Sequence, residues 1–213
     1  MNVFVFPGQG SQHLGMGADL YNSNRKAQQI FEDANEILGF KITDIMFGED
    51  QEALKQTNIT QPAIYIHSMV IALIADKFFK PNAVAGHSLG EFTALAAANY
   101  ISFEDGLRLV HKRAIAMQEA CEKNESSMAA IVGLDDNTVE DVCSQSKETL
   151  VAANYNCPGQ IVISGTINAV NIACNKLTEL GARRALVLPV RGAFHSPLMK
   201  SAEESLSKAI NNI

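Results

Sequence analysis

The sequence feature that most constrains the fold is a turn, Gly-His-Ser-Leu-Gly at positions 86–90, between a short apolar run and an alanine-rich run. The apolar run at 83–85 predicts a buried strand, and the alanine-rich run predicts a helix that ends near residue 99. This is the G-x-S-x-G pattern in the strand–turn–helix context that it requires. Glycines on both sides allow a sharp turn, and the helix directs free N–H groups and its positive dipole end at Ser88. The pattern indicates a nucleophilic serine, although five residues with two free positions also occur in turns without function.

The N-terminal residues predict a second strand followed by a glycine-rich loop. Residues 2–6 are nearly all apolar, as expected of a strand that is buried on both faces. Gly8 and Gly10 in the following loop allow the backbone to approach a ligand closely and to present its N–H groups. The spacing excludes a dinucleotide fingerprint and a phosphate loop. On its own, this loop is interpreted as a turn.

Helical periodicity covers much of the remaining first half. The segments with an apolar stripe or a helical composition are 25–38, 51–56 and 103–122, the last with Ser102 as a weak capping signal. A longer apolar helix is predicted from Thr60, as N-cap, to residue 79, with Pro62 in its first turn. Charged residues within this helix make it too polar for a membrane span, so it is expected in the core. Arg113 belongs to a His-Lys-Arg triplet on the third periodic segment, and such triplets are usually solvated surface.

The second half changes pattern. Strands and helices alternate there in the order β-α-β-β-α-β, the split ferredoxin-like arrangement. We therefore expect a large subdomain formed by residues 1–124 and 190–213, with a small subdomain of residues 125–189 inserted into it. The chain then passes through Ser196-Pro197, a typical helix start. This start places His195 in the loop before a helix, where its side chain can point into a cleft.

Composition excludes some classes of function. The chain has 213 residues with a net charge of −6 and a pI near 5.4, which argues against nucleic acid as a partner. Its four cysteines show no C-x-x-C pair and no metal-ligand spacing, so no metal is expected. Free thiols and the absence of a signal peptide favour a protein of the reducing cytoplasm that does not bind membranes.

Five segments together carry a specific resemblance. They are Phe-Pro-Gly-Gln-Gly-Ser-Gln at 6–12, Gly-His-Ser-Leu-Gly-Glu at 86–91, the helix at 109–120, Asn-Cys-Pro-Gly-Gln-Ile-Val-Ile-Ser-Gly at 156–165 and Gly-Ala-Phe-His-Ser-Pro-Leu-Met at 192–199. In this order they resemble the malonyl-CoA:acyl carrier protein transacylase family, which includes the acyltransferase domains of fatty-acid and polyketide synthases. The resemblance covers residues 1–213. It implies an α/β fold with a three-layer, α/β hydrolase-like large subdomain built on a parallel sheet, and an inserted ferredoxin-like α+β small subdomain.

The resemblance also implies roles for particular residues. Ser88 would carry the malonyl group as an ester, and His195 would be the base that activates it. The backbone N–H groups of Gln9 and Leu89 would form the oxyanion hole. Arg113 would pair with the malonyl carboxylate.

Two further residues are expected to contact the substrate, namely His87 and Phe194. Phe194 would limit the room for an α-methyl branch, which predicts malonyl over methylmalonyl transfer. The implied substrates are malonyl-CoA and the phosphopantetheine thiol of acyl carrier protein, with no cofactor, and the protein is expected to be a monomer.

One departure from the family concerns the C-terminus. Members of the family continue beyond the point where this chain ends, through further strands and a segment whose backbone carbonyl orients the catalytic histidine. We therefore expect either that the chain is a fragment or that another chain completes the site.

Other classes remain open. An α/β-hydrolase esterase or thioesterase would need an acid between the serine and the histidine, and Asp135, Asp136 and Asp141 fall in the inserted subdomain. A patatin-like Ser-Asp hydrolase could use Asp105, which is predicted on a helix. A non-catalytic module that binds acyl carrier protein is the third possibility.

Overall fold

The computed structural model describes residues 1–190 and 192–213, which separate into two compact units. The first unit contains residues 1–115 and 208–213, and the second contains residues 116–207. This division groups residues 116–124 and 190–207 with the smaller sheet, whereas we expected them in the large subdomain. The expected boundaries stay predictions about how the chain is divided into subdomains.

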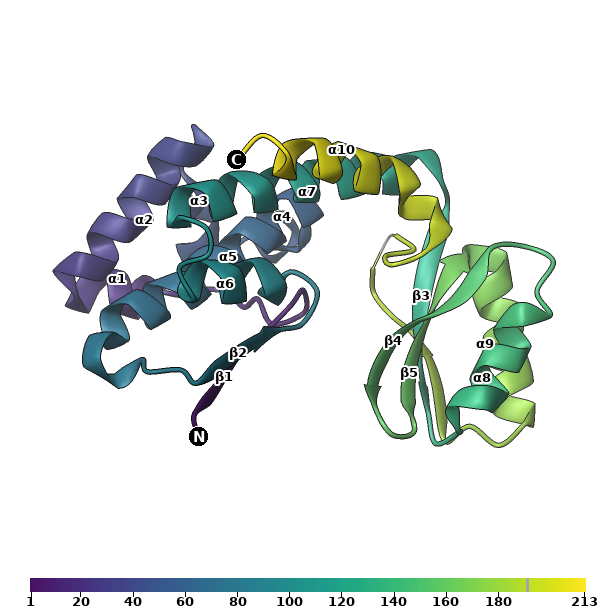
Figure 1. The fold of residues 1–213 in the computed structure, drawn as a ribbon. Helices are drawn as coiled ribbons and strands as arrows, with labels where there is room; N and C mark the ends of the chain where they lie inside the picture. Colours follow the sequence, from purple (N-terminus) through teal and green to yellow (C-terminus); the bar gives the residue numbers. More distant parts are fainter. Residues whose placement is uncertain (191) are drawn as a thin grey trace. The chain divides into compact units, whose positions relative to one another are not determined.

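The sheet of the first unit consists of two parallel strands in the part of the chain that the structure describes. Strand β1 (Val3–Phe6) pairs with β2 (Ala83–Gly86) in register from Val3 opposite Ala83 to Phe6 opposite Gly86 (Figure 1). The prediction of a parallel sheet is therefore confirmed.

The expectation that β1 is buried on both faces is wrong. Phe6 packs in a cluster with Ala72 and Ala94, but Val3 and Val5 are 53% and 75% exposed. Successive side chains of a strand point to opposite faces. Only the face that carries Phe6 is covered by helices of this unit, so the alternate side chains of β1 contact solvent.

Helices form the rest of the first unit. Their bounds are α1 (Ala18–Ser23), α2 (Arg25–Leu38), α3 (Ile42–Phe47), α4 (Gln51–Lys55), α5 (Thr57–Ala75), the 3-10 turn η1 (Asp76–Phe78), α6 (Gly90–Ala97) and α7 (Phe103–Lys123), which continues into the second unit. Helix α2 has its predicted bounds because Asn24 accepts from the first N–H groups and Gly39 adopts a left-handed cap. Helix α7 begins as predicted, with Ser102 Oγ accepting from the Asp105 N–H at 2.9 Å.

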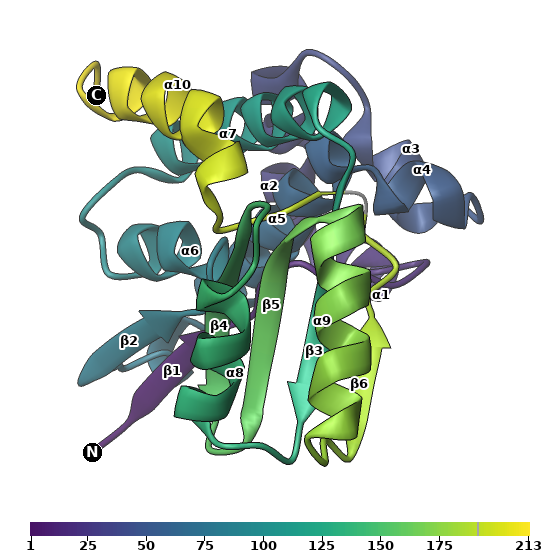
Figure 2. The ribbon, with the colours of Figure 1, turned by 90° about the vertical axis from the view of Figure 1, so that its right-hand side faces the viewer.

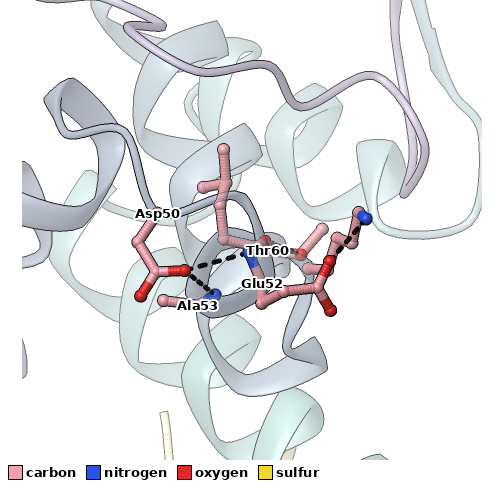
Figure 3. A network of polar contacts seen from close by, with 6 residues as sticks. Asp50, Glu52, Ala53 and Thr60 are labelled. Carbon is pink, nitrogen blue, oxygen red and sulfur yellow. Dashed lines mark hydrogen bonds and ion pairs between the residues drawn. The ribbon is translucent and has the colours of Figure 1, made fainter.

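The predicted N-cap of the long helix, Thr60, lies four residues beyond the observed N-cap, Gln56. Helix α5 begins at Thr57, and Pro62 lies inside it. Thr60 does not cap this helix, because its hydroxyl donates to the carbonyl oxygen of Leu54 at the end of α4. Figure 3 shows Thr60 beside α4, whose own N-cap is Asp50. The threonine therefore joins two consecutive helices instead of starting one.

Helix α5 is the core element of the first unit. Together with η1 it spans Thr57–Phe78, and it is the one described helix long and apolar enough to cross a membrane. Within its most apolar stretch, 67% is buried in the protein. Its side chains Tyr65, Ile66 and Met69 are at most 2% exposed. The segment is a core helix, as predicted.

His67 on α5 makes the first unit sensitive to acid. Burial lowers the pKa of His67 from its ordinary value of 6.5, and the nearby His13 lowers it further, while Asp19 opposes the shift. The unfolded chain therefore binds a proton more readily than the folded chain does below about pH 6.5. We expect the free energy of unfolding to fall with pH below this value, and to fall less in His67→Gln. Chemical denaturation at pH 7.5, 6.5 and 5.5 measures this difference. His87→Gln, at an exposed histidine, is the control and should follow the wild type.

The second unit has the predicted ferredoxin-like topology. Its antiparallel sheet has the order β4-β5-β3-β6. The bounds are β3 (Ser126–Val132), α8 (Asp136–Ser144), β4 (Leu150–Cys157), β5 (Gln160–Thr166), α9 (Ile167–Glu179), β6 (Arg184–Val187), η2 (Pro197–Met199) and α10 (Lys200–Ile210), which from Lys208 onward belongs to the first unit. Helices α8 and α9 lie on one face of the sheet (Figure 2). Ala129, Ile131 and Ile163 contact them there.

The other face of this sheet packs on a second hydrophobic cluster. Met128 and Val162 lie there together with Phe194 and Met199. The predicted helix start after His195 is confirmed, because Ser196 accepts from the Leu198 N–H at the beginning of η2.

Candidate active site

The turn at 86–90 has the geometry of a nucleophile elbow. It connects β2 to α6, and Ser88 adopts a positive φ of 51°, which is unusual for a residue other than glycine. The N–H of His87 donates to the Phe6 carbonyl at 3.0 Å, which joins the turn to the end of β1. Strained backbone of this kind persists only where the surroundings determine it, and it is concentrated at functional sites.

Both glycines of the elbow are required by close backbone packing. A Cβ atom at Gly86 would lie 1.9 Å from the carbonyl carbon of Gly90, and one at Gly90 would lie 2.2 Å from the Phe6 carbonyl oxygen. Strand β2, the start of α6 and the end of β1 therefore approach one another without side chains between them. This packing also brings the loop that begins at Pro7 against the elbow, since Pro7 O lies 2.9 Å from the same Cβ position.

This packing predicts a large loss of stability for Gly86→Ala. The added methyl group would overlap backbone atoms that no rotamer change can move, so we expect a loss of more than about 3 kcal/mol in the free energy of unfolding. Gly39→Ala is the control, because Gly39 has a positive φ of 76° but nothing within 4 Å of its Cβ position. It should lose only about 1–2 kcal/mol from backbone strain. Equal losses in urea denaturation of the two variants would show that contact at Gly86 is unimportant.

Arg113 from α7 lies beside Ser88. Its Nη2 donates to Ser88 Oγ at 2.9 Å, and its Nη1 donates to Gln61 Oε1 at 2.5 Å. The guanidinium carbon is also 5.9 Å from the centre of the Phe92 ring. Only 8% of Arg113 is exposed. The alternative that this arginine belongs to a solvated surface is therefore wrong.

The charge of Arg113 is buried without a carboxylate partner among the described residues. The ion pairs there involve other cations, namely Lys55, Arg108 and Lys200. Burial lowers the pKa of Arg113 to about 10, and Glu91 opposes this shift. The guanidinium is thus cationic at neutral pH and is held by two neutral oxygen atoms. Buried cations are normally paired, so this environment is suited to an anionic group of a ligand.

Gln61 is a site residue that the sequence analysis missed. It is 1% exposed on α5, and its side-chain oxygen sets the orientation of the Arg113 guanidinium. We interpreted Thr60-Gln61-Pro62 only as a helix start. A glutamine among apolar residues in a core helix is the available signal, because a buried amide needs a polar partner.

The structure brings only some of the predicted residues together. Ser88 and Arg113 are in contact, and the loop that carries Gln9 packs at the elbow through Gly90. Leu89 is 1% exposed at the position before α6, whereas His87 is exposed.

His195 and Phe194 lie in the second unit, and their approach to Ser88 stays a prediction. His195 is exposed and has a positive φ of 58°. Phe194 is 8% exposed within a hydrophobic cluster. Among the described residues, no group of three potential metal ligands gathers at either place.

Comparison with known proteins identifies relatives along almost the whole chain. Residues 3–213 match the family described as "Acyl transferase domain". The chain is 43% identical over 212 residues to the malonyl CoA-acyl carrier protein transacylase of Staphylococcus aureus, covering 98% of this chain and 68% of that protein. The corresponding protein of Bacillus subtilis is 43% identical over 213 residues, with 98% and 67% covered.

Solved structures agree with this similarity. The malonyl CoA-acyl carrier protein transacylase of Coxiella burnetii superposes with a TM-score of 0.95 at 39% identity, covering 99% of this chain and 68% of that one. A malonyl-transacylase solved in complex with its type II polyketide synthase acyl-carrier protein gives 0.94 at 37% identity, with 99% and 70% covered. The chain thus spans about two thirds of the length of its relatives. With the elbow in place and the match extending from β1 to α10, this chain belongs to the acyl transferase domain family.

Proposed function

We propose that this protein transfers a malonyl group from malonyl-CoA to the phosphopantetheine thiol of acyl carrier protein, through an ester on Ser88. The observation that carries the proposal is the buried Arg113 guanidinium, bonded to the Ser88 hydroxyl and without a carboxylate partner in the described chain. A cation at this place is suited to an acyl group that ends in a carboxylate. Relatives named as malonyl transacylases support the same substrate.

The first half-reaction forms the acyl ester. Ser88 Oγ attacks the thioester carbonyl carbon while His195 accepts the hydroxyl proton. When the tetrahedral intermediate collapses, the C–S bond breaks and CoA leaves as a thiol with the proton from His195. In the second half-reaction the carrier thiol gives its proton to His195 and attacks the ester carbonyl carbon. The ester C–O bond then breaks, and Ser88 Oγ takes the proton back from His195. No cofactor or metal is needed for either step.

Charge that develops on the carbonyl oxygen needs donors that are already in place. The N–H groups of Gln9 and Leu89 are proposed for this role. Leu89 directly precedes α6, where the first N–H groups of a helix lack intrahelical acceptors. The loop of Gln9 packs against the same turn through Gly90. One donor of this type stabilises a transition state by about 3–4 kcal/mol.

Arg113 is proposed to hold the carboxylate at the far end of the malonyl group. Its fork offers two parallel donors, which a planar carboxylate matches. Phe194 and His87 are proposed to shape the acyl pocket, with Phe194 disfavouring an α-methyl branch. The proposal further takes the protein to be a soluble cytoplasmic monomer whose protein partner is acyl carrier protein.

Intact-mass analysis after mixing with acyl-CoA tests the proposal. A malonyl adduct that disappears when carrier protein with a free phosphopantetheine thiol is added, while that carrier gains the malonyl group, is the expected result. Methylmalonyl-CoA should label the protein less than malonyl-CoA does. Release of free malonate without transfer would identify a hydrolase instead. If the protein forms no adduct and neither transfers nor hydrolyses the acyl group, the remaining interpretation is a non-catalytic module that binds acyl carrier protein.

A further inference from the structure

The loop that carries His195 is held in a strained conformation in the second unit. His195 has a φ of 58°, which costs a residue other than glycine free energy unless its surroundings impose it. The residues just before it are buried, with Ala193 at 0% and Phe194 at 8% exposure, whereas His195 itself is exposed. The loop therefore presents one imidazole from a backbone that is anchored in the interior.

Serine hydroxyls supply the polar part of this anchor. Ser164 Oγ donates to the Phe194 carbonyl at 2.7 Å. Ser126 Oγ accepts from the Ala193 N–H at 3.0 Å, and Ser196 Oγ donates to the Ala193 carbonyl at 2.6 Å. Ser164 and Ser126 belong to the adjacent strands β5 and β3 and are 0% and 5% exposed. The loop is thus bonded to the rigid sheet and not only to itself.

The bond from Ser164 has a particular consequence for His195. The Phe194 carbonyl belongs to the peptide plane that joins Phe194 to His195, and the orientation of this plane defines φ of His195. Relaxation of His195 toward negative φ would rotate this plane away from Ser164. Both the carbonyl and the hydroxyl would then lose their partners in a fully buried environment, which is costly.

Close packing at Gly192 also confines this loop. A Cβ atom at Gly192 would lie 2.2 Å from Cys121 Sγ and 3.0 Å from the Phe194 ring. Burial raises the pKa of this Cys121 thiol to about 11, so it remains a neutral packing group. Packing at Gly192 and the serine hydrogen bonds therefore hold the loop together.

We propose that Ser164 is a positioning residue for His195. Its hydrogen bond holds the Phe194–His195 peptide plane and thereby fixes the direction in which the His195 side chain extends from the loop. This inference rests on the proposed function in taking His195 as the base. It also accounts for a serine in the segment at 156–165, which the catalytic roles do not explain. The proposed role is exerted through the backbone, so Ser164 itself touches no substrate.

Ser164→Ala tests the role, with Ser127→Ala as a matched control. Ser127 lies on β3 and is also buried, with 7% exposure. Side chains alternate along a strand, so Ser126 and Met128 point to the sheet face that packs on the His195 loop, whereas Ser127 points to the opposite face, which is covered by α8 and α9. We expect the rate of Ser88 acylation by malonyl-CoA to fall about tenfold in Ser164→Ala and to stay at the wild-type value in Ser127→Ala. The limb of the pH–rate profile that reports the base should also shift in Ser164→Ala only.

Histidine NMR keeps the test independent of activity. The ring resonances of His195 and their titration should change in Ser164→Ala, while those of His13, His67 and His111 stay in place. Unchanged His195 resonances in a folded Ser164→Ala protein would overturn the positioning role. If these resonances move but the wild-type chain forms no malonyl adduct, the proposed function fails while the structural role of Ser164 stands.

Discussion

Ser88→Ala protein mixed with malonyl-CoA is expected to show no added acyl group, and transfer to acyl carrier protein should fall by at least about 10⁴-fold. The reason is that the variant removes the only side-chain hydroxyl among residues 86–90, which Ser88 carries at the turn with a φ of 51°. Intact-mass analysis detects the adduct, and peptide mapping of the wild type should locate it on Ser88.

Two controls make this result specific. Ser88→Cys retains a nucleophile at the same point of the elbow and should still become acylated. Thermal unfolding of Ser88→Ala should stay cooperative with a modest decrease in Tm, because alanine meets the same backbone strain as serine while the buried Arg113 guanidinium loses the Ser88 hydroxyl as an acceptor. An adduct that persists in Ser88→Ala would contradict the assigned nucleophile.

Arg113→Ala is expected to reverse the acyl preference of the protein. Malonyl transfer should fall by about 10²-fold, because two charge-assisted hydrogen bonds to the carboxylate are lost. Acetyl transfer should rise, because a neutral acyl group no longer meets a buried cation beside Ser88. Competition between malonyl-CoA and acetyl-CoA, measured by adduct mass, gives the ratio directly.

Neighbouring residues supply the controls for Arg113. Arg108 lies on the same helix, but it is exposed and paired with Glu104, so Arg108→Ala should leave the acyl preference unchanged. Gln61→Leu removes the oxygen that orients the guanidinium and should cause a smaller loss of malonyl transfer than Arg113→Ala. An Arg113→Ala protein that still prefers malonyl-CoA would exclude Arg113 from the substrate site.

The charge state of Arg113 adds a pH dependence. Burial lowers its pKa to about 10, so the cation is fully present at neutral pH and is lost as the pH rises through that value. The malonyl preference should therefore be constant between pH 7 and 8.5 and decline toward pH 10, within the range where the protein stays folded.

Much of the secondary structure could be predicted because it depends on neighbouring residues. Helix α2 follows from an apolar stripe between Asn24 and Gly39, and its predicted bounds are confirmed. Helices α1 and α3 were not predicted, since each has six residues and too few turns to show a period. The predicted N-cap role of Thr60 was wrong because its hydroxyl bonds to the Leu54 carbonyl, and this bond depends on how α4 and α5 pack together.

The sequence by itself determined the elbow, the ferredoxin-like order of the second unit and the family. Each of these follows from short runs of neighbouring residues, and few other structures are compatible with their spacing. Only the tertiary structure decided that Arg113 is buried against Ser88, that Gln61 orients it, and that Ser164 bonds the loop of His195. These contacts join residues that are 25, 52 and 30 positions apart along the chain. Hydrogen bonds between such distant side chains depend on helix packing and strand register, which no local pattern of residues specifies.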